Sequence, residues 1–506
     1  MAKKTKKIKK RKKAVREAVA ILEKTSSICP TCQSVIPATI IEKGGKAIMQ
    51  KNCEKHGKFE EVCYDADEYK KAMKFMKYVE DSEKGCNFSC KGYDKHMTET
   101  CLAVIDLTNR CNLRCSYCFA NSAVSNKIYE PSSQQIKDTI TFLRKAQPRC
   151  NAILFSGGEP TLRDDLFEIL DHARKEKFDC LMIATNGIKM AYDLDYVKEA
   201  AKHKLGLLYL SFDGLDDNTN KEKRNHLVIN QLLDNCRKAG LGVVLVPTVI
   251  RGQNEHTLFE IIKFAAKNVD VIKGINFQPV GFTGRMSAKE RKKQRYNIPD
   301  LCKDIEKQSN GKIKASDFYP VTAAVPLSNL LEVISGQKII RFSMHPICGS
   351  ATYLYIDNGE IVPISEFLRV DEFLNLCDKY TNEIKEKKWF FRTLATMKMI
   401  KDLPSMAGNR KVELINLLIN LIIKKDYEAL TKFHQKALFV GAMHFQDPYN
   451  MNFERLKRCG VHYITPDKQI IPFCAYNNLG YREAIEGKHS KCAYSNLGYE
   501  ERAAGI

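Results

Sequence analysis

Cys111-Asn-Leu-Arg-Cys115-Ser-Tyr-Cys118 is the stretch that decides the fold of this 506-residue chain. It follows a short, mostly apolar run, Leu102–Leu107, which predicts a buried strand. The three cysteines therefore fall in the loop at the end of that strand, with the spacing C-x3-C-x2-C. Three thiolates on one tight loop can hold three irons of a [4Fe-4S] cluster and leave the fourth iron open to a ligand.

Apolar runs and helical patterns alternate after this loop, as in the helical spacing from Ser133 to Lys145. Repeated strand then helix predicts an α/β fold with a parallel sheet and right-handed crossovers. Six such units favour a partial (β/α)6 barrel of the TIM type over residues 102–300. We expect its strands at Leu102–Leu107, Ala152–Phe155, Cys180–Ala184, Leu207–Phe212, Val243–Val249 and Ile275–Phe277.

Three more motifs follow expected strands. They are Ser156-Gly157-Gly158-Glu159-Pro160 after the second, Thr185-Asn186-Gly187 after the third, and Ser211-Phe-Asp213-Gly214 at the end of the fourth. Glycines let a backbone approach a ligand closely, and a carboxylate accepts hydrogen bonds from an ammonium group. Together with the cysteine spacing, these motifs in residues 100–285 resemble the radical S-adenosylmethionine (SAM) superfamily.

The resemblance implies two sets of site residues. Cys111, Cys115 and Cys118 would hold the radical SAM [4Fe-4S] cluster. The expected SAM-binding residues are Tyr117, Gly157, Gly158, Glu159, Asn186, Ser211 and Asp213. The radical formed from SAM, a 5′-deoxyadenosyl radical, would remove the hydrogen atom, so no protein residue is assigned as the catalytic group.

Residues 26–66 predict a small metal module in front of the barrel. They are rich in Cys, Pro, Gly and Lys and too short to form an apolar core. Cys29-Pro-Thr-Cys32 and Cys53-Glu-Lys-His56 have the spacing of a rubredoxin-like or zinc-ribbon site for one iron or zinc ion. Cys63 competes with His56 for the fourth ligand position.

The other cysteine groups lie before and behind the barrel. Residues 67–101 predict a connector with a first group, and residues 301–506 predict a helix-rich region with two hairpins that present a second group. These hairpins resemble the SPASM-like extensions found behind many radical SAM barrels. We expect auxiliary [4Fe-4S] clusters with the candidate ligands Cys86, Cys90, Cys101, Cys348, Cys459, Cys474 and Cys492.

The charge of the chain is concentrated at its start. The net charge is +21, and residues 1–24 carry +9 of it. Residues 1–25 predict a basic arm, either solvated or continuing through Ile21 and Leu22 as an amphipathic helix suited to an anionic surface. We expect a cytoplasmic protein that can lie on the cytoplasmic face of a membrane, and the dispersed remaining charge makes nucleic acid a poor partner.

The whole arrangement is similar to an archaeal radical SAM family with two chemistries. One couples isoprenoid chains into tetraether lipids, and the other methylates 7,8-dihydro-6-hydroxymethylpterin. Apolar segments at Trp389–Ile400, Val412–Ile423 and Ala437–Phe445 favour a channel for a lipid, with ordinary core packing as the alternative account of them. No local group of carboxylates and amides indicates a pterin pocket. We therefore expect C–C coupling of archaeal diether lipid, with pterin methylation as the alternative.

A third hypothesis for the function, from a different class of protein, is an iron-sulfur enzyme that modifies RNA. A ferredoxin or flavodoxin would supply the electron for SAM cleavage.

Overall fold

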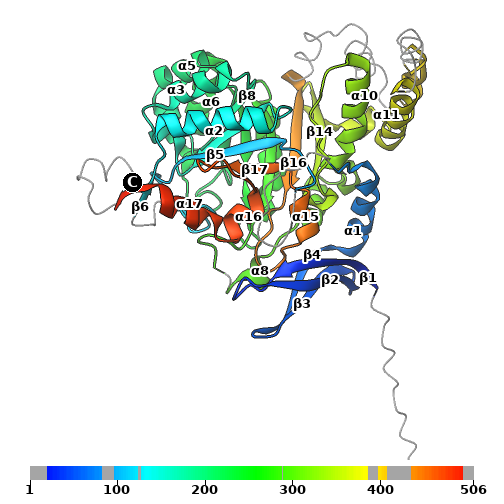
Figure 1. Cartoon of the computed structure of the whole chain (residues 1–506). Helices are drawn as coiled ribbons and strands as arrows, with labels where there is room; N and C mark the ends of the chain where they lie inside the picture. The colour runs from blue at the N-terminus through cyan, green and yellow to red at the C-terminus, as the bar shows by residue number, and fades with distance from the viewer. Residues whose placement is uncertain are drawn as a thin grey trace, which may run out of the picture.

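The computed structural model describes residues 20–81, 96–122, 127–287, 289–385, 397–399, 401–406 and 435–493. The chain opens with an antiparallel sheet in the order β1-β2-β3-β4 (Figure 1). Its strands are β1 (Ile21–Ile28), β2 (Val35–Lys43), β3 (Lys46–Cys53) and β4 (Gly57–Asp65). Gly44 and Gly45 join β2 to β3 with φ of 58° and 71°, as a tight hairpin with two left-handed residues requires.

Strand β1 changes the expected end of the basic arm. Residues 21–25 were expected to continue a helix, but they belong to β1, where Thr25 pairs with Ala38 of β2. Cross-strand hydrogen bonds satisfy this backbone, and such tertiary pairing overrides a short helical pattern. Residues 1–19 lie outside the described part of the chain.

The central sheet confirms the partial barrel. Six parallel strands lie side by side in chain order, so each crossover joins neighbours. They are β5 (Leu102–Thr108), β7 (Ala152–Gly157), β8 (Cys180–Thr185), β9 (Leu207–Ser211), β10 (Gly242–Val246) and β12 (Ile272–Pro279), with β11 (Thr248–Val249) beside β12. The intervening helices are α2 (Ser133–Ala146), α3 (Leu166–Lys175), α4 (Ile188–Tyr192), α5 (Leu194–Lys202), α6 (Ile229–Ala239) and α7 (Leu258–Lys267).

C-terminal strands extend both edges of the barrel sheet. At one edge, β17 (Val461–Ile464) pairs in parallel with β5 and antiparallel with β18 (Ile470–Pro472). At the other edge, β16 (Ala437–Met443) pairs in parallel with β12 and antiparallel with β14 (Gly349–Asp357), which pairs with β15 (Glu360–Pro363). Each expected hairpin therefore becomes part of the barrel sheet (Figure 1).

Strand β16 corrects another expectation. Residues 437–445 were expected as an apolar segment of a lipid channel, but residues 437–443 form a buried strand between β12 and β14. A short apolar run fits a buried strand as well as a helix, and the sheet decides between them. Residues 412–423 and most of 389–400 lie outside the described residues. Among the described helices, none has the length and apolar character that crossing a bilayer requires.

The remaining elements surround the sheet. Helices α10 (Val325–Ser335) and α11 (Val370–Lys385) pack on each other around an apolar core that is separate from the barrel core and includes Tyr380 and Cys377. These elements are β6 (Lys127–Tyr129), β13 (Tyr319–Pro320), β19 (Ser490–Ala493), α1 (Ala66–Met73), α8 (Arg291–Gln294), α9 (Ile298–Gln308), α10 (Val325–Ser335), α11 (Val370–Lys385), α15 (Phe453–Lys457), α16 (Phe473–Asn478) and α17 (Tyr481–His489).

A buried ion network joins the N-terminal sheet to the barrel. Figure 1 shows α8 and α15 next to the N-terminal sheet. Arg295 donates from Nε to Glu61 of β4 at 2.9 Å and from Nη1 to Asp447 at 2.5 Å. Asp447 in turn accepts from the Phe282 backbone N–H, just beyond β12, at 3.1 Å. Lys51 of β3 donates to the Pro448 carbonyl at 2.7 Å, and burial lowers the pKa of Lys51 to about 8. One set of charges thus joins the metal module, the barrel and the C-terminal region.

Candidate active site and metal centres

The cysteine loop opens into a cavity of about 200 Å³ inside the barrel. Because the carboxyl ends of parallel strands face the same way, the loops after β5, β7, β8 and β9 meet there. The cavity is lined by Cys111, Cys115, Cys118, Tyr117, Gly157, Gly158, Glu159, Asn186 and Ser211. Of the predicted cluster and SAM residues, Asp213 alone does not line it.

The two glycines after β7 have a role that the sequence interpretation missed. Both line the cavity, where their approach to SAM stays a prediction, and both also approach the cysteine loop closely. A Cβ on Gly158 would meet the Arg110 carbonyl oxygen at 2.0 Å, and one on Gly157 would meet that of Thr108 at 2.1 Å. The Gly158 N–H donates to the Thr108 carbonyl at 2.6 Å. The β7 loop is therefore fixed directly against the start of the cysteine loop.

Glu159 is buried and anchors the loop after β8. Its Oε1 accepts from the Thr161 hydroxyl at 2.7 Å and from the Thr185 hydroxyl at 2.8 Å, and its Oε2 accepts from the Asn186 N–H at 2.8 Å. Burial raises the pKa of Glu159, and these hydrogen bonds oppose the rise. A carboxylate has about four acceptor positions, so Oε2 keeps capacity for a donor in the cavity that Glu159 lines.

Asp213 joins three parts of the site behind the cavity wall. It is buried and accepts from the Tyr117 hydroxyl, from Lys223 Nζ at 2.8 Å and from the Thr248 N–H at 2.8 Å. These hydrogen bonds join the cysteine loop to the segments that follow β9 and β10, and contact of Asp213 with SAM stays a prediction. Lys223, which the sequence interpretation missed, lines the cavity as its buried cation.

Burial governs the thiols of the cysteine loop. It raises the pKa of Cys111 to about 12 and that of Cys115 to about 11, although Lys223 opposes the rise at Cys115. A metal ligand must be the thiolate, so binding of a cluster here releases protons. Three thiols from one loop, facing one cavity beside an acceptor and amide groups, fit a [4Fe-4S] cluster with SAM.

A polar group faces the cysteine loop across the barrel. Asn276 of β12 donates to the Tyr209 hydroxyl of β9, and the Gln278 side chain also hydrogen-bonds to Tyr209. Tyr209 and Gln278 line the cavity. Two aromatic rings, those of Phe445 and Phe473, stack at 4.1 Å between centroids and line the cavity as well. The sequence did not predict this group, because its members come from elements that are far apart in the chain.

The N-terminal sheet brings together the four predicted mononuclear ligands. The ligand atoms of Cys29, Cys32, Cys53 and His56 all lie within 4.8 Å of one another. His56 Nδ1 is 3.5 Å from the sulfur of Cys29 and 3.5 Å from that of Cys53. Three sulfurs and one imidazole at this spacing fit a single zinc or iron ion.

Cys63 is not a rival ligand, which corrects that expectation. It is buried on β4 and its thiol donates to the Glu61 carbonyl at 3.7 Å, outside the four-residue group. Burial raises the pKa of Cys63 to about 11. Side chains alternate along a strand, and Cys63 points into the core of the module.

Replacing Cys53 with serine is expected to remove one metal ion per chain. A structural site of this kind binds with about 10–16 kcal/mol, so losing one thiolate from four ligands leaves little affinity. Metal analysis of the purified variant measures the loss, and Lys58→Ala, an exposed change on β4 of the same sheet, serves as the control that keeps the ion. Full metal content in Cys53→Ser would show that the ion is held elsewhere.

The two C-terminal hairpins bring three distant cysteines together, of which Cys474 is buried and Cys348 and Cys459 are half-buried. Cys348 precedes β14, Cys459 precedes β17, and Cys474 lies in α16 after β18. Arg455 hydrogen-bonds to Cys348, and Cys474 is near enough to interact with its charge. Burial, followed by the neighbouring Cys474 and Cys348, raises the pKa of Cys459. Among the described residues, the group with the spacing for a single metal ion is Cys29, Cys32, Cys53 and His56. The three hairpin cysteines do not have that spacing.

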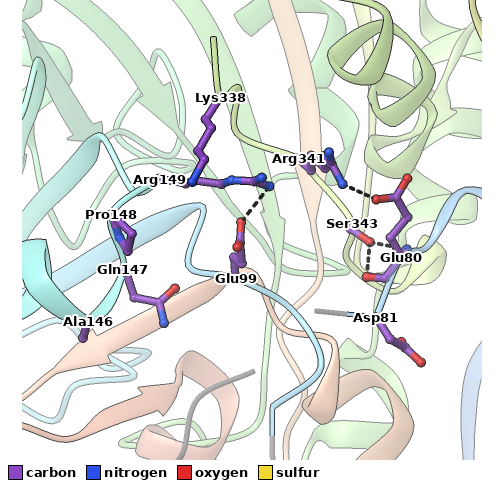
Figure 2. Close-up of a pocket in the computed structure, with 10 residues that line it drawn as sticks. All are labelled: Glu80, Asp81, Glu99, Ala146, Gln147, Pro148, Arg149, Lys338, Arg341 and Ser343. Atoms are coloured by element: carbon purple, nitrogen blue, oxygen red, sulfur yellow. Dashed lines mark hydrogen bonds and ion pairs between the residues drawn. The ribbon is translucent and has the colours of Figure 1, made fainter. Parts of the chain in front are cut away.

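Cys101 lies beside Gly460, the residue after Cys459, and its N–H donates to the Gly460 carbonyl at 2.8 Å. A charged pocket of about 360 Å³, lined by Glu99 and Arg341, is close by. The Cys101 thiol donates to the Arg341 carbonyl at 3.2 Å. Figure 2 shows that Arg149 faces Glu99 across the pocket, 3.5 Å apart, while Arg341 pairs with Glu80. Cys86 and Cys90 lie outside the described residues, as does the side chain of Cys492.

Two protein-family profiles match the chain. The profile of the radical SAM superfamily matches residues 105–265, which span the cysteine loop and most of the barrel. The profile described as the HMPTM N-terminal zinc ribbon domain matches residues 21–65, the four-stranded sheet with its group of cysteines and histidine.

Individual relatives agree with the profiles. The 7,8-dihydro-6-hydroxymethylpterin dimethyltransferase of Methanocaldococcus jannaschii is 42% identical over 485 residues, which cover 92% of this chain and 96% of that protein. A GTP 3′,8-cyclase of Limosilactobacillus fermentum is 29% identical and covers 60% of this chain and 86% of its own length. The crystal structure of Streptococcus suis SuiB bound to precursor peptide SuiA is 20% identical, with a TM-score of 0.36, and covers 48% of this chain and 50% of that chain.

Proposed function

This chain belongs to the radical SAM superfamily and to the family of the 7,8-dihydro-6-hydroxymethylpterin dimethyltransferase, and on that basis we propose that it methylates a 7,8-dihydropterin ring. The observation that carries the proposal is 42% identity to that enzyme along 92% of the chain. The match includes the N-terminal module and the C-terminal hairpins, which a match confined to the barrel would leave out. SAM and a [4Fe-4S] cluster are the cofactors of the superfamily.

The same match corrects the expected lipid-coupling reaction. The relative is named for a pterin substrate and a methyl transfer, and not for joining lipid chains. One apolar segment that favoured a lipid channel is strand β16, whose apolar side chains are buried in the sheet. Archaeal diether lipid and a membrane surface are therefore not proposed as partners, and the RNA-modifying alternative is dropped because the relative acts on a pterin.

The polar side chains of Tyr209, Asn276 and Gln278, across the barrel from the cysteine loop, support a pterin as the substrate. A pterin is a flat ring with a 2-amino-4-oxo edge, which offers both donors and acceptors to amide and hydroxyl groups. Gln278 and Tyr209 present such groups at the cavity wall, and the stacked rings of Phe445 and Phe473 add aromatic surface to the lining, which suits a flat ring. Guanine carries the same edge, and the cyclase relative is named for GTP. The chemistry shared by these two substrates matches the group at Tyr209.

The proposed roles divide between the cofactors and the chain. When bound, the cluster and SAM supply a radical that can remove a hydrogen atom from carbon. Cys111, Cys115 and Cys118 would hold the cluster, while Glu159 would accept from the SAM ammonium group. The apolar remainder of the cavity excludes water from the radical. A one-electron reductant of the ferredoxin or flavodoxin class would start the reaction.

The group of Cys348, Cys459 and Cys474 is proposed as the ligand set of an auxiliary [4Fe-4S] cluster. Arg455 would balance part of the negative charge of such a cluster, because it lies beside two of the thiols in a buried place. Cys474 also lines a small cavity together with Tyr117 and Gln278. An auxiliary cluster there would stand next to the proposed pterin site.

The direct test is an anaerobic incubation of reduced enzyme with 7,8-dihydro-6-hydroxymethylpterin, SAM as the radical source and a donor of the transferred carbon, in one arm a second molecule of SAM and in the other a methylene-carrying folate or pterin. Mass analysis of the pterin follows. We expect products heavier by one and two methyl groups, together with 5′-deoxyadenosine. GTP in place of the pterin is the comparison substrate. Release of 5′-deoxyadenosine without any methylated pterin would refute the pterin proposal and leave the radical SAM assignment standing.

Gln278→Leu is expected to lower kcat/KM for the pterin by about 10- to 100-fold. The change removes a donor and acceptor at the cavity wall and leaves a buried polar edge of the substrate unpaired, which costs about 1–3 kcal/mol. SAM cleavage without pterin should stay near the wild-type rate. The control is Gln134→Leu, an exposed change on α2 outside the barrel. Equal loss of both reactions in Gln278→Leu would indicate damage to the barrel and not to recognition.

A further inference from the structure

The segment between β9 and α6, residues 213–225, reaches the cysteine loop through two adjacent side chains. Glu222 accepts from the Ser116 N–H at 3.1 Å and from the Ser116 hydroxyl at 3.0 Å. Ser116 directly follows Cys115. The carboxylate therefore holds the backbone between the second and third cysteines by two hydrogen bonds, one of them to a main-chain donor.

Lys223 acts on the next residue of the loop, Tyr117, mainly through Asp213. Its ammonium group donates to Asp213, which also accepts from the Tyr117 hydroxyl, and it lies 5.6 Å from the centroid of the Tyr117 ring. Lys223 is 4% exposed and lines the same cavity as Cys115. Two successive loop residues, Ser116 and Tyr117, are thus fixed by two successive residues of the other segment.

The segment that carries these residues is itself tightly built. Asn220 donates to the Gly214 carbonyl at 3.0 Å and to Asn225 at 2.9 Å. Asn225 donates to the carbonyls of Asn186 at 2.8 Å and Ser211 at 2.7 Å, both on loops that line the cavity. A Cβ on Gly214 would meet the Thr219 hydroxyl at 2.0 Å, so the turn closes on itself. Glu222 and Lys223 therefore sit on a rigid support.

We propose that Glu222 and Lys223 form a clamp of positioning residues, which fixes the backbone between Cys115 and Cys118 and sets one negative and one positive charge beside the radical cluster. A reduced cluster carries one more negative charge than an oxidised one. A nearby ammonium group favours the reduced form and a nearby carboxylate disfavours it, most strongly where water is excluded. The proposal rests on the superfamily assignment and holds for any substrate in the barrel.

The test is the reduction potential of the radical cluster in the intact holoenzyme. An EPR-monitored titration measures it, and the signal that changes on addition of SAM identifies this cluster among others. Lys223→Met is expected to shift the potential to more negative values. Glu222→Gln, which keeps the size of the side chain, is expected to shift it to more positive values. Lys223→Arg keeps the charge and should return the wild-type potential.

Opposite shifts separate the clamp from a general structural role, since loosening the loop would move both variants the same way. The matched controls are Lys221→Met and Asp217→Asn, which make the same charge changes at exposed positions of the same segment and should leave the potential unchanged. Shifts of one sign, or none, would overturn the proposal. So would an arginine variant that behaves like the methionine variant. None of these outcomes depends on the pterin assay.

Discussion

Cys118→Ala is expected to abolish formation of 5′-deoxyadenosine and of every product that depends on it. Cys118 is one of three thiols that face the cavity from a single loop, and no fourth described cysteine lines that cavity to replace it. A cluster with two thiolate ligands is poorly held. Since the cofactor supplies the radical, its loss removes the whole rate enhancement, which for enzymes is about 10⁶-fold or more.

The measurement combines iron analysis with mass detection of 5′-deoxyadenosine from dithionite-reduced enzyme and SAM. Cys180→Ala is the matched control, because Cys180 begins β8 on the barrel, is half-buried and does not line the cavity. The control should keep its iron and its activity. Formation of 5′-deoxyadenosine by Cys118→Ala at more than background would contradict the assignment of the radical cluster.

Asp447→Ala is expected to lower the free energy of unfolding by about 3–5 kcal/mol, the loss that follows when one partner of a buried charge network is removed. Asp447 is 0% exposed, and its removal leaves Glu61 as the carboxylate that still accepts from the buried Arg295. The Phe282 N–H also loses its acceptor. Denaturant titration of the holoenzyme measures the change.

A surface change provides the control for Asp447. Asp195→Ala removes an ion pair with Lys198, 3.6 Å away at an exposed helix surface, and should change the stability by about 0.5 kcal/mol or less. Burial alone would raise the pKa of Asp447, but Arg295 and backbone donors hold it below its usual value. The contribution of Asp447 is therefore complete above the usual pKa of a carboxyl group and is lost as the pH falls below that range. A stability change in Asp447→Ala no larger than in Asp195→Ala would contradict this role.

Local patterns in the sequence were sufficient for the class of fold and for two metal groups. Residues 111–118 carry their ligand spacing within eight positions, and Cys29, Cys32, Cys53 and His56 lie within 28. Apolar runs separated by helical patterns predicted the order of the six strands, because each unit of the barrel pairs with its neighbour in the chain. Information of this kind is local, so it can be read without knowing the tertiary structure.

Local sequence patterns did not predict contacts between residues that are far apart in the chain. Residues 437–443 of the Ala437–Phe445 segment form strand β16 because they pair with β12 and β14. Cys63 faces the core because side chains alternate along β4. Asp213 accepts hydrogen bonds from Tyr117, Lys223 and Thr248, three residues that its own sequence motif does not name. The hydrogen-bond partners of a polar side chain depend on which residues the tertiary structure places near it.

The sequence by itself determined that this chain is a radical SAM enzyme with a small metal module in front of its barrel. Only the tertiary structure decided which residues surround that chemistry. In the folded chain, the cysteines of the two hairpins, Cys348, Cys459 and Cys474, lie near one another. Tyr209 hydrogen-bonds to Asn276 and Gln278, and Glu222 and Lys223 lie against the cysteine loop. The reason is physical: ligand spacing on one loop is a property of neighbouring residues, whereas charge balance and hydrogen-bond partners depend on distances that exist once the chain has folded.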